Sequence, residues 1–196
     1  MRAAPQPVSE LLVWPMHSSQ QVMFTAASLL CAALGSVHDL RDRRIPNFIT
    51  GPAVLAGLAL HLALGGPAEL GGSALAGLAA GGIFLIFFLA GGMGAGDVKL
   101  MTAVGCLAGL PPLQLVMVWT IVAGAVFALA VAVWRGRLRQ TLGNVIVLLE
   151  HHGSAGLTPH PEINLGNPAT LRLPFALPIA AGCLVTLCTL AWEAHS

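Results

Sequence analysis

The chain has 196 residues, of which 9% are charged and 56% hydrophobic, with a mean hydropathy of +0.82 and a formal net charge of +1. Soluble domains carry about a quarter charged residues, and a soluble fold of this size could not bury so much apolar surface. The composition therefore excludes a soluble domain and gives no sign of a nucleic-acid partner. It predicts an all-α, polytopic integral membrane protein whose surroundings are the lipid bilayer.

Apolar runs of about 20 residues, the length that crosses the hydrocarbon core as a helix, divide the chain. Residues 1–20 are interpreted as an N-terminal leader, expected to be mobile, and residues 21–192 as one membrane-embedded domain. About six transmembrane helices are predicted within that domain. The candidate spans are Gln21–Val37, Phe48–Leu64, Ser73–Ala90, Val98–Leu110, Leu113–Trp134 and Leu173–Trp192. The fourth is short and closes at two prolines, which makes it the least regular of the six.

Between the last two spans the composition changes. The stretch RGRLRQTLGNVIVLLEHH combines three arginines with aliphatic residues at partial helical spacing, and a Gly/Pro/Asn-rich loop follows it. Such a pattern is typical of an amphipathic helix lying along a membrane surface. Residues 135–172 are therefore predicted to form a cytoplasmic or interfacial segment.

The basic residues fix an orientation. If the loop after the first span is cytoplasmic and the spans alternate, all Lys and Arg residues except Arg2 lie on the cytoplasmic side, as the positive-inside rule requires. They are Arg41, Arg43, Arg44, Lys99, Arg135, Arg137, Arg139 and Arg172.

Two of the three aspartates are then expected at the same membrane surface, Asp39 at the end of the first span and Asp97 in the turn before the fourth. Two neighbouring carboxylates in a partly dry site share one proton, so that one activates water while the other donates a hydrogen bond to a scissile carbonyl. This chemistry needs neither a metal nor another cofactor. In GAGD, Gly94 and Gly96 would allow a sharp turn and a close approach of substrate backbone.

Structural roles are open for the same residues. Asp39 and Asp42 could pair with the neighbouring arginines at a helix end, and Asp97 could be the N-cap of the fourth span. Lys99 could simply extend to the lipid headgroups.

Cysteines and histidines give no catalytic or metal motif. Cys31, Cys106, Cys183 and Cys188 lie in apolar runs and are expected to be small buried residues. His38 stands at a span end, His61 near the outer end of the second span, and the other histidines considered, His151, His152 and His160, in a polar loop where solvation is favoured over metal binding.

Two motifs together resemble those of the type IV prepilin leader peptidases. DLRDRRIPNFIT, from Asp39, is similar to the family's first motif, and GAGDVKLMTAVG, with Asp97, to its GxGD motif; LPFALPIAAG is similar to the segment that opens its last span. By position, Asp39 and Asp97 would be the catalytic aspartates, whereas Asp42 matches no catalytic position. Asn47 stands where many members have a second acidic residue.

The resemblance implies a membrane-embedded aspartic endopeptidase of the bacterial inner membrane, cleaving the basic leader of prepilins or pseudopilins at the cytoplasmic face. Longer members carry a CxxC-bearing region and also methylate the new terminus. The sequence lacks that region and resembles the short members of Flp, or tight-adherence, pilus systems, so methyl transfer is expected to be absent. Two alternatives stay open: a GxGD-type protease of other membrane proteins, and a non-enzymatic transport or assembly subunit.

Overall fold

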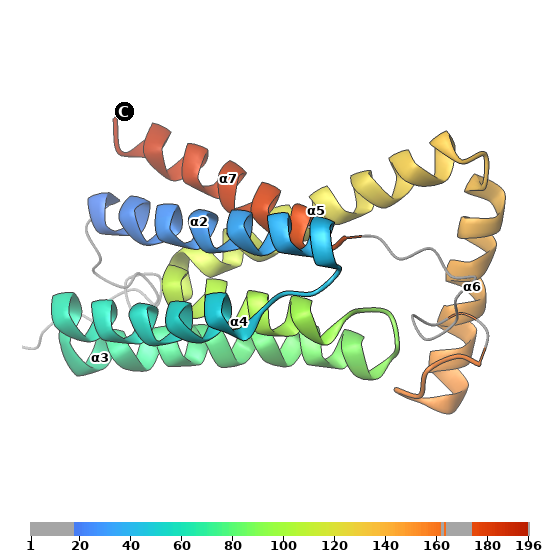
Figure 1. Cartoon of the computed structure of the whole chain (residues 1–196), viewed down its shortest axis with the longest axis horizontal. Helices are drawn as coiled ribbons and strands as arrows, with labels where there is room; N and C mark the ends of the chain where they lie inside the picture. Colours follow the sequence, from blue (N-terminus) through green and yellow to red (C-terminus); the bar gives the residue numbers. More distant parts are fainter. Residues whose placement is uncertain (1–17, 162, 164–173, 196) are drawn as a thin grey trace, which may run out of the picture.

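The computed structural model describes residues 18–161, 163 and 174–195, and all regular structure in this part of the chain is helical (Figure 1). The all-α prediction is confirmed, while the prediction for the leader falls mostly outside the described residues. The helices are α2 (Ser18–Asp42), α3 (Asn47–Leu89), α4 (Ala95–Ala108), α5 (Leu110–Trp134), α6 (Leu138–Ala155) and α7 (Ala176–Glu193).

Four of the described helices, α2, α3, α5 and α7, are long and apolar enough to cross a membrane. Each predicted span overlaps a helical segment, but two of the six fall within α3 and a third corresponds mainly to the short α4. A polytopic membrane protein is thus supported, and the number six stays a prediction.

Helix α3 consists of two arms that fold back on each other. Gly66 has a non-helical backbone (φ 75°, ψ −166°), and Pro67 opens the second arm with a φ that suits a first helical position. A Cβ on Gly57 in the first arm and a Cβ on Gly77 in the second would both contact Cys106 of α4. In a straight helix these glycines would lie about 30 Å apart, so the chain must reverse between them, as Figure 1 shows.

Helix α4 is the centre of the bundle. It has only 14 residues, and every residue from Leu100 to Ala108 except Thr102 is buried. It packs mainly on both arms of α3 and on α2. A segment of about 21 Å that is enclosed by other helices need not meet the length requirement of a lipid-facing span.

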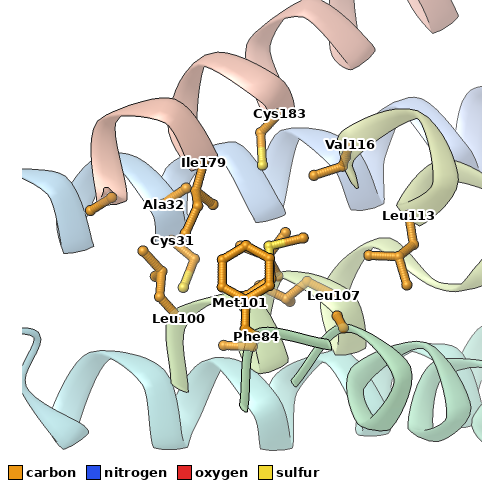
Figure 2. Packing of buried hydrophobic residues seen from close by; sticks show 14 of the residues in the cluster. Cys31, Ala32, Phe84, Leu100, Met101, Leu107, Leu113, Val116, Ile179 and Cys183 are labelled. Carbon is orange, nitrogen blue, oxygen red and sulfur yellow. The ribbon is translucent and has the colours of Figure 1, made fainter. Parts of the chain in front are cut away.

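The core forms where α2, α4, α5 and α7 meet the second arm of α3. Figure 2 shows Met101 and Leu100 of α4 between Cys31 of α2, Phe84 of α3 and Ile179 of α7. Glycine allows the closest contacts, because a Cβ on Gly105 would lie 2.8 Å from the carbonyl oxygen of Ala76. These contacts hold α4, and therefore its first turn, in a defined position.

One cysteine differs from the prediction. Cys31, Cys106 and Cys183 are buried as expected, but Cys188 is exposed on α7. An apolar helix in a membrane protein has a face toward lipid as well as a face toward protein, and composition does not separate the two.

Candidate active site

The end of α2 places Asp39. Helix α2 ends at Asp42, and Arg43 adopts a left-handed conformation (φ 51°) while its N–H donates to the Asp39 carbonyl at 3.0 Å. The chain then turns through the buried Ile45 and the extended Pro46 into α3. The turn leaves the Asp39 side chain partly buried three residues before the helix end, while Asp42 is exposed.

The beginning of α4 places Asp97. Gly94 is the N-cap, and Asp97 is the third helical residue, so the alternative that Asp97 itself caps the helix is wrong. Its Oδ2 accepts a hydrogen bond from the Gly94 N–H at 3.3 Å. A carboxylate in the first turn is favoured by the positive end of the helix dipole, and the second oxygen of the group is left for other contacts.

Both aspartates line one cavity of about 320 Å³ at the end of the bundle where α2 ends and α4 begins. Asp42 is not among the residues that line it. The lining residues are Asp39, Arg43, Arg44, Ile45, Gly94, Ala95, Gly96, Asp97 and Lys99. All four site residues predicted from the sequence therefore lie in the same cavity, although Asp39 and Asp97 come from different helices.

The cavity perturbs the titration of Asp97. Burial and, second, the charge of Asp39 raise the pKa of the Asp97 carboxyl to about 7, against the smaller lowering effect of the Gly94 N–H. A carboxyl group with this pKa is protonated in about half of the molecules at neutral pH, next to the Asp39 charge that helps to raise the pKa. This is the electrostatic condition under which two carboxylates divide the roles of acid and base.

The two predicted glycines differ in their contacts. A Cβ on Gly96 would lie 3.3 Å from the Cβ of Ile45, so Gly96 allows α4 to approach the turn after α2. Gly94 has φ −83°, which other residues also adopt, and its nearest side-chain neighbour is the Asp97 carboxylate. The contact of Gly96 with Ile45 joins the two sequence motifs directly, and it does not require a bound substrate.

Lys99 has a protein partner. Its ammonium donates to Oδ1 of Asn47, the first residue of α3, at 3.0 Å. Lys99 is nevertheless exposed, so the expectation that it extends toward headgroups stays a prediction. Local sequence does not show this link because the two residues lie far apart in the chain, although a single lysine two residues after Asp97 is a signal of a specific role.

Other polar groups lie outside the cavity. His61, at the opposite end of the bundle, is stacked on Phe24 with ring centroids 4.0 Å apart, and its Nε2 lies 3.1 Å from the Leu107 carbonyl oxygen. The His151 ring packs edge-on against those of His152 and His160. Within the described part of the chain, no group of three or more His, Cys, Asp or Glu side chains is arranged to hold a metal ion.

The fold and the cavity define an all-helical membrane protein with two carboxylates at one end of its bundle. The model of the type IV leader peptidase family matches residues 24–129, a range that includes both aspartates. The chain belongs to this family, and the resemblance seen in its motifs is confirmed.

Two curated relatives from Burkholderia pseudomallei, strains 1026b and K96243, are each named prepilin leader peptidase/N-methyltransferase. Both are 40% identical over 124 residues, which cover 58% of this chain and 39% of the relative. The chain thus spans about two fifths of the length of these relatives. No solved structure matches it, and the expectation about methyl transfer stays a prediction.

Proposed function

We propose that the protein is a membrane-embedded aspartic endopeptidase in which Asp39 and Asp97 are the catalytic pair. The observation that carries the proposal is the shared cavity, in which burial and the Asp39 charge raise the Asp97 pKa. Family membership supports a peptidase and the names of the relatives support prepilin-like substrates. The peptidase domain would extend over residues 21–192.

In the proposed reaction, the ionised carboxylate accepts a proton from a water molecule, whose oxygen attacks the scissile carbonyl carbon. The protonated carboxyl donates a hydrogen bond to the carbonyl oxygen as negative charge develops there. Collapse of the tetrahedral intermediate breaks the C–N bond, and the amine leaves with a proton from the pair. The raised pKa favours Asp97 as the group that holds the proton at the start.

The substrate is proposed to be the basic leader of a prepilin or pseudopilin, cut at the cytoplasmic face of the inner membrane. The cavity lies at the end of the bundle that carries Arg43, Lys99 and Arg135 (Figure 1). Positive charge favours the cytoplasmic side, so the same charges that orient the chain orient the cavity.

The test is cleavage by amide variants of the full chain, co-expressed with a candidate prepilin whose mass is then measured. Asp39→Asn and Asp97→Asn should each lower cleavage by orders of magnitude while expression stays near wild type. The double variant should be scarcely worse than either single one, because the pair works as a unit.

Asp42→Asn is the matched control, because Asp42 lies one helical turn from Asp39 but outside the cavity. It should retain substantial activity. Loss of cleavage in Asp42→Asn with retention in Asp39→Asn would show that the pair is wrongly assigned. Normal cleavage by all three single variants would overturn the protease proposal and favour a transport or assembly subunit.

A further inference from the structure

Helix α6 carries an apolar face that nothing in the described structure covers. None of its residues is buried. Leu142, Ile146 and Leu149 are 55%, 58% and 70% exposed, and with Leu138 and Val145 they fall at the spacing that places residues on one side of a helix. Gln140 and Asn144 lie on the opposite side of the helix. An amphipathic helix in water would bury such a face, so α6 needs another surface.

The position of α6 indicates which surface this is. The candidate span α5 ends at Trp134, which is 88% exposed. At Gly136 (φ 64°) a C-terminal turn redirects the chain, with the Gly136 N–H donating to Val133 at 2.9 Å. Helix α6 then begins at Leu138, four residues after the end of α5, and runs across the end of the bundle, crosswise to α2 and α3 (Figure 1). If α2, α3 and α5 cross the bilayer, a helix in this place runs along the membrane surface.

The charges around the start of α6 indicate the chemistry of the surface that the helix contacts. Arg135, Arg137 and Arg139 are concentrated where α5 passes into α6, and Glu150 is the only acidic residue between residues 135 and 155. Basic residues next to a membrane are attracted to anionic headgroups, each contributing about 1 kcal/mol. An apolar face beside a basic cluster matches an anionic lipid surface better than it matches a basic leader peptide.

We infer that α6 binds the surface of the surrounding bilayer, with the face formed by Leu138, Leu142, Val145, Ile146 and Leu149 in the acyl region and the three arginines on anionic lipid headgroups. This lipid-binding surface is separate from the cavity, and its binding to lipid does not depend on peptidase activity. The helix would lie beside the cavity at the same end of the bundle. It would thus hold that end of the protein at a fixed depth.

The test uses the full chain with Cys188→Ser, since the other three cysteines are buried. A fluorophore is attached at Leu142→Cys or, as the matched control, at Gln140→Cys on the opposite side of the helix. Each protein is reconstituted in phosphatidylcholine vesicles with or without phosphatidylglycerol, and quenching by lipids brominated in their acyl chains is measured. Circular dichroism checks that each labelled protein is folded.

Quenching should be strong at position 142, at least about twofold weaker at position 140, and greater when phosphatidylglycerol is present. Arg137→Gln and Arg139→Gln should each reduce the equilibrium constant for binding of α6 to the surface of anionic vesicles by about fivefold. Equal quenching at positions 142 and 140 would overturn the inference. Quenching at position 142 that does not depend on anionic lipid would also overturn it. So would protection of position 142 from quenching that increases with protein concentration, because this would indicate that a second copy of the chain covers the face.

Discussion

The close contact between the first arm of α3 and α4 can be tested with one methyl group. In Gly57→Ala the new Cβ would lie 2.6 Å from the Cys106 carbonyl oxygen and 2.9 Å from the Leu107 nitrogen. Both are backbone atoms, which cannot rotate away as a side chain would. Ordinary contacts lie at about 3.5 Å or more, so α4 must move by about 1 Å or the helices must separate.

Overpacking of this kind costs about 1–3 kcal/mol, offset in part by the gain of up to about 1 kcal/mol when alanine replaces glycine in a helix. We therefore expect a lower thermal unfolding midpoint in detergent. Cleavage should fall as well, because α4 carries Asp97, the proposed catalytic residue, and a displacement of about 1 Å in a catalytic group can lower a rate about 100-fold.

Gly51→Ala is the control within the same arm, since no atom lies within 4 Å of the Cβ that it would add. It should leave cleavage unchanged and keep or slightly raise the unfolding midpoint. If Gly57→Ala were as stable and as active as Gly51→Ala, the packing of α4 against this arm would be refuted.

Three further outcomes follow from the cavity. Gly96→Val should reduce cleavage by about tenfold or more, because its side chain would press on Ile45, whose Cβ is 3.3 Å from the Cβ position; a wild-type rate would contradict this. Asn47→Asp should keep activity, because a carboxylate still accepts the hydrogen bond from Lys99, whereas Asn47→Leu should lower activity by about two- to fivefold. Equal cleavage rates for these two variants would show that the hydrogen bond between Lys99 and residue 47 has no role in activity. The carboxyl of Asp97 binds its proton more tightly in the folded protein than in the unfolded one. As the pH rises from about 5 to about 8, the thermal unfolding midpoint should therefore decrease more in wild type than in Asp97→Asn. Parallel curves of midpoint against pH would exclude the raised pKa.

The candidate site could be predicted because it depends on segment ends. Lengths of apolar runs place Asp39 at the end of the first segment and Asp97 between the third and the fourth, and alternation of the segments brings both to the same side. The cavity contains both, along with Gly94 and Gly96. Local sequence is enough for this result, because the ends of apolar runs can be located without knowing how the side chains pack.

The remaining features depend on contacts between distant residues. The link from Lys99 to Asn47 and the contact of Gly96 with Ile45 join two motifs that are separate in the chain. Hydropathy also could not show that α4 is enclosed by protein, because lipid-facing and protein-facing apolar residues look alike in sequence. The reversal within α3 was expected between residues 64 and 73, and GGP at 65–67 marks its position, but the helix continues to Gly66 before it breaks.

The enclosure of α4 has a consequence for the order in which the protein assembles. The groove that receives α4 is built mainly from α2 and the two arms of α3, all of which a ribosome makes before α4. The helix can therefore dock as soon as it leaves the translocation machinery, and the cavity can close before α5 and α7 have been inserted. Until α4 docks, a nascent chain has Asp39 in place without Asp97. If the proposed pair is catalytic, an unfinished copy would therefore be unable to cut the other proteins that are entering the membrane beside it.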